Sequence, residues 1–251
     1  MRAIIFLLLF MGISAGAGAE GIGASVEVEV RSDNRGVMPL YPLAGRNQNR
    51  KAYVEAVKGE NYGIIVRNRL NRRVGVVIAV DGRNIISGKK SRLRNSERMY
   101  ILEPYEAGEF SGWRTGLDSI NRFYFTDVAD SYAAAFRDES AMGVIAVAVY
   151  PEQRRYEAPM EMSQEKDAAK GAPSARAQSE SAGTGFGREE YSPARTVAFE
   201  PETVAAEKIY LKYEWRSTLC RQRIVDCGRE WPRRNRMWDD DGFAPPPPGR
   251  L

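Results

Sequence analysis

Short apolar stretches separated by turn-forming residues run through most of the chain. Residues 24–30 (ASVEVEV) alternate valine with glutamate, which is the two-residue period of a half-buried strand. Further stretches rich in Val, Ile, Tyr or Phe are bounded by Gly, Pro, Asn or Asp, and they cover residues 51–57, 61–70, 72–80, 98–104, 108–114, 121–128 and 142–150. We therefore predict an all-β fold, an antiparallel β-sandwich of the jelly-roll or immunoglobulin-like type.

Residues 20–151 form the main part of this predicted sandwich. Within it, the Ala-rich residues 133–137 favour a single helical turn inserted between two strands. Residues 152–190 differ in composition, because they are poor in aliphatic residues and rich in Ala, Ser, Gly, Glu and Lys. Such a segment cannot bury enough apolar area to become ordered unaided, so we predict a flexible excursion whose Gly-rich residues 183–187 lead back to the sandwich.

Strand-like patterns return towards the C-terminus. Residues 194–202 and 207–215 predict two strands joined as a hairpin at 201–206, so that the segment 191–217 completes the sandwich. The remaining residues, 218–251, are polar and end in a short proline run, which predicts an extended tail.

The N-terminus has the pattern of a secretory signal peptide. Arg2 precedes an apolar stretch at residues 4–11, and small residues follow up to Ala19, where cleavage would remove residues 1–19. This stretch is shorter than the about 20 apolar residues that cross a bilayer, and we expect no transmembrane segment after cleavage. We therefore expect an exported protein of the periplasm or cell surface.

Cysteine and histidine limit the chemistry available. The only cysteines, Cys220 and Cys227, are close in sequence, and an oxidising compartment favours a disulfide between them. A metal site is the weaker alternative, because structural zinc takes four ligands. The chain has no histidine, which excludes Ser-His-Asp triads, Cys-His dyads and HExxH zinc sites. We predict no catalytic, cofactor-binding or metal-binding residues.

Asp81 and Gly82 separate two apolar stretches. Both residues tolerate the positive φ of a type I′ turn, so we predict a hairpin in which residues 76–80 pair with residues 84–86. The alternative makes Asp81, with Asn84, part of a cation or sugar site.

Basic residues gather between positions 67 and 98, where ten positive charges face only Asp81 and Glu97. Such a cluster could hold an anionic partner. The expected partners are an envelope protein, an anionic glycan or a lipid headgroup, and nucleic acid is the least accessible to an exported protein. The alternative is a solvated strand face and loop. The candidate residues are Arg67, Arg69, Arg72, Arg73, Lys89, Lys90, Arg92 and Arg94.

Trp113, Trp231 and Trp238 are candidate aromatic contacts. The two later tryptophans alternate with arginines, a combination that suits stacking on sugar rings or a membrane interface. The alternative is that Trp231 and Trp238 pack the tail against the sandwich.

Several motifs carry a resemblance to a known group of proteins. They are YGIIVRNRLNRRVGVVIAVDGRNIISG at residues 62–88, then YILEP, FSGWR, FYF and GVIAVAVY, and later GTGFG, FEP and IYLKY. With these motifs the chain resembles a family of functionally unassigned exported β-rich proteins of Gram-negative bacteria. The resemblance implies a secreted β-rich domain of the envelope and carries over no catalytic residue.

Strand density, the signal-peptide pattern and the lack of histidine together predict a non-enzymatic envelope module that binds a partner or has a structural role. Two alternatives remain open. One is a carboxylate-based hydrolase of an envelope polysaccharide, which needs two carboxylates across a cleft. The other is a subunit of a surface assembly.

Overall fold

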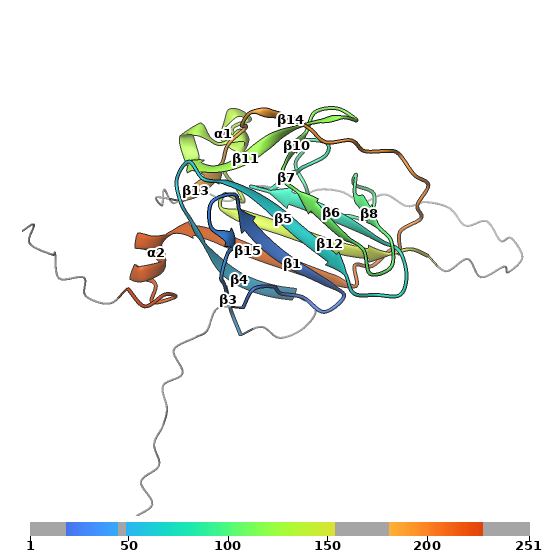
Figure 1. Ribbon diagram of the computed structural model, residues 1–251, viewed down its shortest axis with the longest axis horizontal. Coiled ribbons are helices and arrows are strands. Elements are labelled where there is room, and N and C mark those ends of the chain that lie inside the picture. The colour runs from blue at the N-terminus through green and yellow to red at the C-terminus, as the bar shows by residue number, and fades with distance from the viewer. Residues whose placement is uncertain (1–18, 45–48, 154–180, 228–251) are drawn as a thin grey trace, which may run out of the picture.

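The computed structural model describes residues 19–44, 49–153 and 181–227. Over these residues the chain forms two β-sheets, of eight and seven strands, that face each other (Figure 1). The first sheet has the order β10-β11-β5-β1-β2, with β13 and β14 also paired to β11 and β9 to β5. Its strands are β1 (Val26–Ser32), β2 (Gly36–Val37), β5 (Asn61–Asn68), β9 (Ala107–Phe110), β10 (Gly112–Arg114), β11 (Ser119–Asp127), β13 (Ala182–Thr184) and β14 (Glu189–Tyr191).

The second sheet has the order β3-β4-β15-β12-β6-β7, with β8 also paired to β6. The prediction of an all-β sandwich is confirmed. Two short helices, α1 (Tyr132–Ala135) and α2 (Arg216–Arg221), and one 3₁₀ turn, η1 (Val128–Asp130), complete the described elements. The strands of the second sheet are β3 (Leu40–Pro42), β4 (Asn49–Ala56), β6 (Val74–Val80), β7 (Arg83–Asn84), β8 (Tyr100–Leu102), β12 (Val144–Pro151) and β15 (Glu207–Trp215).

One strand pair departs from the antiparallel prediction. β15 runs parallel to β4 over the whole length of β4, from Lys208 opposite Asn49 to Trp215 opposite Ala56. On its other side β15 is antiparallel to β12. The second sheet is therefore mixed, and its central strand comes from the far end of the described chain (orange in Figure 1).

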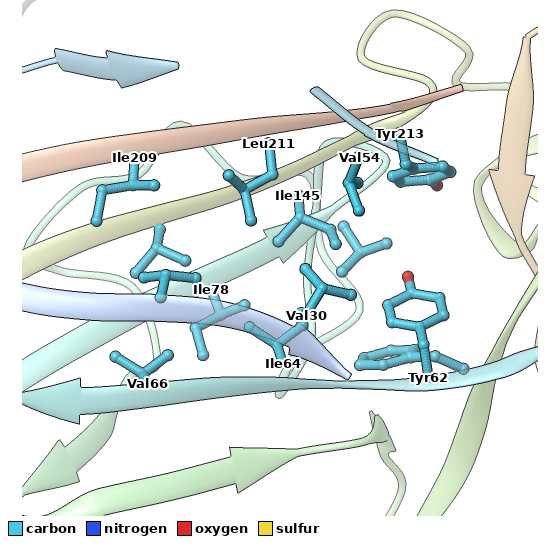
Figure 2. Packing of buried hydrophobic residues seen from close by; sticks show 14 of the residues in the cluster. Val30, Val54, Tyr62, Ile64, Val66, Ile78, Ile145, Ile209, Leu211 and Tyr213 are labelled. Atoms are coloured by element: carbon cyan, nitrogen blue, oxygen red, sulfur yellow. The ribbon is translucent and has the colours of Figure 1, made fainter. Parts of the chain in front are cut away.

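The core lies between the two sheets and follows the alternation seen in the sequence. Val26, Val28 and Val30 of β1 are fully buried, while the glutamates between them lie on the outer face. Figure 2 shows aliphatic side chains of both sheets, Ile64 and Ile209 among them, filling the space between the strands. Burying one such side chain contributes about 1.5–3 kcal/mol, so this alternation drives the pairing of the sheets.

The second sheet is covered on its outer side as well. Every residue of β6 is buried, and a second apolar cluster forms where Val77 and Ala79 of β6 meet Leu93 and Ala148. A strand that is buried on both faces loses the two-residue alternation and becomes continuously apolar, as β6 is. The segment containing Leu93 therefore packs on the outer face of the second sheet.

Two predictions for the later part of the chain were wrong. Residues 194–202 form no regular strand, although Pro201 makes an isolated bridge with Glu152. Residues 182–190, assigned to the flexible excursion, instead contribute β13 and most of β14 to the first sheet. Their Gly-rich sequence carries no alternation, so pairing with β11 depends on tertiary contacts. The predicted helical turn is present as α1.

The predicted signal peptide up to residue 18, most of the flexible excursion and the Pro-rich tail from residue 228 lie outside the described residues. Among the helices that are described, none is both long enough and apolar enough to cross a membrane.

Candidate functional site

A basic segment, residues 89–98, forms a loop against the outer side of β6. It begins where Lys90 forms an isolated β-bridge with Arg83 of β7, and the Met99 side chain just after it contacts Gly75 of β6. Leu93 anchors its middle by packing on the sheet, and the Tyr150 hydroxyl donates a hydrogen bond of 2.5 Å to the Leu93 carbonyl. Contacts with β6 and β12 thus hold the basic segment against the second sheet.

Glu97 fixes the shape of the basic segment from within. Its Oε1 accepts hydrogen bonds from the backbone N–H groups of Arg92 and Arg94, at 2.8 and 2.9 Å. Burial would raise the pKa of Glu97, but these hydrogen bonds and one from Ser91 outweigh it and lower the pKa. Glu97 is the one carboxylate of the segment, and it binds backbone N–H groups. The cationic side chains of the segment therefore have no acidic partner within the segment.

Four exposed cations of this segment form no ion pair with any described residue: Lys89, Arg92, Arg94 and Arg98. Like charges held close together on one surface raise the local positive potential. This set includes three of the residues predicted from the sequence and adds Arg98.

The other predicted cations are neutralised by acids from distant parts of the chain. Arg67 and Arg69 pair with Glu27, at 3.8 and 2.6 Å. These two residues lie on the outer face of the first sheet, on the opposite side of the sandwich from the basic segment. The predicted cluster is therefore not one continuous surface.

The remaining pairs lie at the two ends of β6. Arg72 pairs with Glu202 at 2.7 Å, and Lys90 pairs with Asp138 at 3.3 Å. Arg73 lies between Glu103 at 3.2 Å and Glu152 at 2.8 Å. These ion pairs join the ends of β6 to loops that are remote in sequence.

Asp81 and Gly82 form the predicted turn. Both have positive φ, of 49° and 76°, and Val80 pairs with Arg83 across them. Beyond the two residues of β7, the Ile85 N–H still bonds the Ile78 carbonyl at 3.0 Å. The predicted turn is confirmed, but the hairpin is shorter than predicted, because Val76 pairs with Tyr100 of β8.

Asp81 also belongs to a buried polar cluster that the sequence did not indicate. Its Oδ1 accepts hydrogen bonds from the Gly143 N–H at 2.8 Å and the Tyr213 hydroxyl at 2.5 Å, and its Oδ2 accepts one from the Thr184 N–H at 2.7 Å. The Thr184 hydroxyl contacts the hydroxyls of both Tyr213 and Tyr62 at 2.7 Å, and Figure 2 shows these two tyrosines pointing towards each other from opposite sheets. The cluster ties the two sheets together at one end of the core.

Burial raises the pKa of Asp81 to about 6, against hydrogen bonds from Tyr213, Thr184 and Gly143 that favour the charged form. A raised carboxyl pKa is frequent at catalytic sites. Asp81 is fully buried and its three donors are internal, so the contacts assign it a structural role.

Trp113 was wrongly predicted to be an exposed aromatic contact. The side chain is only 2% exposed, its Nε1 donates a hydrogen bond to the Gly185 carbonyl at 3.0 Å, and its ring meets Phe123 edge to face. An indole whose N–H is satisfied inside the protein is a core residue. Trp231 and Trp238 lie outside the described residues.

Cys220 and Cys227 form the predicted disulfide, with their Cα atoms 5.6 Å apart. It closes a short loop after α2, which itself follows β15 directly. The bridge fixes the last described residues to the end of α2.

The comparisons with known proteins identify no relative: no family model, curated protein or solved structure matches the chain. Within the described ranges, no group of three or more His, Cys, Asp or Glu side chains could hold a metal ion.

Proposed function

We propose that this protein is an exported, non-catalytic β-sandwich that binds an anionic polymer of the bacterial envelope. The observation that carries the proposal is the basic segment, whose four exposed cations have no acidic partner among the described residues. The disulfide and the signal-peptide pattern are compatible with export.

The basic segment suits a polyanion better than a small anion. Its two ends lie close together, since Asn84 donates hydrogen bonds from its backbone N–H to the Lys89 carbonyl at 2.9 Å and from its side chain to the Arg98 carbonyl at 2.8 Å. The segment is therefore a compact loop, and its four exposed cations can meet several charges of one polymer. The apolar anchor at Leu93 and the carboxylate of Glu97 keep the backbone of the segment in place, which lowers the entropy lost on binding.

Three of the buried carboxyl groups, those of Asp81, Glu60 and Glu207, have internal partners on both oxygens, while Glu214 pairs with Lys212 through one oxygen. Glu207 accepts hydrogen bonds from the N–H groups of Ala24 and Ser25, between 2.8 and 3.0 Å. Glu60 binds Arg35 at 2.7 Å. These contacts favour structural roles for the carboxylates and thus a binding protein over a hydrolase.

The proposal is tested by neutralising the basic segment. We expect the combined Lys89→Gln, Arg92→Gln, Arg94→Gln and Arg98→Gln variant to bind polygalacturonate about tenfold or more weakly, since an exposed ion pair contributes about 0.2–1 kcal/mol. Isothermal titration calorimetry at two salt concentrations measures the loss, which should shrink as salt screens the charges. Thermal unfolding followed by circular dichroism should be unchanged, because these side chains are exposed.

A matched control removes the same number of positive charges elsewhere, by replacing Arg31, Lys51, Arg67 and Arg69 with Gln. Those residues are exposed on β1, β4 and the region of β5, away from the basic segment. The control variant should bind like the native protein. Equal weakening in both variants would mean that net charge alone attracts the polymer and would overturn the proposal.

A further inference from the structure

Three aromatic residues form a patch beside the start of the basic segment. Tyr132 and Phe136 come from α1 and its C-cap, and Phe186 comes from the connection between β13 and β14. The Tyr132 ring lies 5.0 Å from Phe136 and 5.4 Å from Phe186, measured between centroids. Phe136 is 53% exposed and Phe186 is 44% exposed. We call Tyr132, Phe136 and Phe186 the aromatic patch.

The aromatic patch rests on a stack of rings that continues into the core. Tyr132 packs on Trp113 at 4.3 Å, and Trp113 meets the fully buried Phe123 at 5.2 Å. The hydrogen bond from Trp113 to Gly185 fixes the backbone next to Phe186. The exposed rings are therefore held in place before any ligand arrives, which reduces the entropic cost of stacking.

An uncompensated cation lies beneath the patch. The Arg83 guanidinium sits 4.0 Å from the centroid of the Phe136 ring and is 8% exposed. It donates a hydrogen bond of 2.7 Å to the Gly88 carbonyl, its Nε has no hydrogen-bond partner, and it makes no ion pair with the described residues. A buried charge without a counter-charge is costly, and an anion bound nearby would reduce that cost.

The aromatic patch is continuous with the basic segment. A Cβ built on Gly88 would lie 2.7 Å from the Tyr132 hydroxyl, so the chain passes directly against this ring before it reaches Lys89. Arg137, which is exposed and next to Phe136, is a third cation near the patch, besides Arg83 and Lys89. A polymer bound at the basic segment would therefore lie beside the aromatic patch.

An acid beside the patch favours a polymer that carries hydroxyl groups. Asp138, two residues after Phe136, accepts a hydrogen bond from the Ser140 hydroxyl at 2.6 Å and pairs with Lys90. A carboxylate accepts hydrogen bonds from hydroxyl groups, which a polysaccharide carries and an inorganic polyphosphate lacks. Rings, hydroxyls and moderately spaced negative charges occur together in an acidic polysaccharide.

We propose that the aromatic patch is a stacking subsite for a sugar ring of an acidic polysaccharide, with the acidic group of the sugar attracted by Arg83, Lys89 and Arg137. The apolar C–H face of a pyranose packs against an aromatic ring through dispersion and weak C–H contacts. This inference rests on the proposed function and narrows the polymer to a carbohydrate.

The test replaces the two most exposed rings by leucine, which keeps apolar packing and removes the aromatic face. We expect the Phe136→Leu/Phe186→Leu protein to bind polygalacturonate about fivefold to tenfold more weakly, as estimated from the worth of aromatic pairs. Its affinity for inorganic polyphosphate, a polyanion without rings, should not change. Tyr105→Leu is the matched control, because Tyr105 is 65% exposed and follows β8 at the opposite end of β6.

The outcomes separate this inference from the proposed function. Binding of both polymers by the native protein, with no effect of the leucine substitutions, would overturn the sugar subsite and leave the basic segment as the site. Failure of the native protein to bind either polymer would overturn both proposals. Tighter binding of single-stranded DNA or anionic vesicles than of polygalacturonate, weakened by the same substitutions, would overturn the assignment to a carbohydrate.

Discussion

The carboxylate of Asp81 is held by three uncharged donors inside the core. An ionised group in such a place gains from its hydrogen bonds but loses its hydration, and the second effect is the larger one here, since the pKa of Asp81 is raised. The Asp81 side chain therefore links the turn to β13 and β15, and the free-energy cost of burying it depends on pH.

Lowering the pH should strengthen the fold through Asp81. Because the pKa of about 6 in the folded state exceeds the ordinary 3.8, the folded protein binds more protons than the unfolded chain between these values. This stabilisation is full below about pH 4 and is lost as the pH rises through about 6. Between pH 7 and pH 5 the native protein should gain about 1–2 kcal/mol relative to Asp81→Asn, measured by urea unfolding at each pH. A constant difference between the two proteins would show that Asp81 does not titrate in this range.

The partners of Asp81 explain why only part of its role could be predicted. Its place in a turn follows from Asp-Gly between two apolar stretches, a local pattern. Thr184 and Tyr213, in contrast, are 103 and 132 residues away in sequence. Trp113 failed as a predicted contact for a similar reason, because its burial depends on rings from β11 and α1.

The hairpin of β6 and β7 depends on Gly82. A side chain at this position would adopt a φ of 76°, and its Cβ would lie 2.9 Å from the Cβ of Ala141. Gly82→Val should lower the free energy of unfolding by about 2–4 kcal/mol, from backbone strain and from this contact. Chemical denaturation measures the loss.

Gly36→Val is a suitable comparison, because Gly36 has a φ of 72° and nothing within 4 Å of a Cβ. This variant should show the backbone strain alone and lose about 1 kcal/mol. Equal losses in the two variants would contradict a role for the contact with Ala141.

Among the elements, strands with an apolar pattern, either alternating or continuous as in β6, were predicted, and short strands without one were not. β1 and β15 alternate because one face of each lies on the core. β13 and β14 are three residues long and are defined by their pairing with β11. The aromatic patch was missed because its rings come from α1 and from the segment taken to be flexible.

At the scale of the whole molecule, β15 holds the second sheet together. It lies between β4 and β12 and contributes the buried side chains Ile209, Leu211 and Tyr213 (Figure 2). A chain ending at residue 206 should therefore fail to fold, and circular dichroism and near-ultraviolet spectra should lack a cooperative unfolding transition. A chain ending at residue 227 keeps every described element and should unfold cooperatively. Cooperative unfolding of the shorter chain would show that β15 is dispensable.

The position of β15 also sets the order of events during synthesis. Roughly 150 residues separate β4 from its parallel partner, which a ribosome adds in about 8–30 s at 5–20 residues per second. During that time β4, and later β12 once it is made, expose strand edges that the last described strand covers in the folded protein. The nascent chain therefore depends on chaperones or on fast folding to escape aggregation.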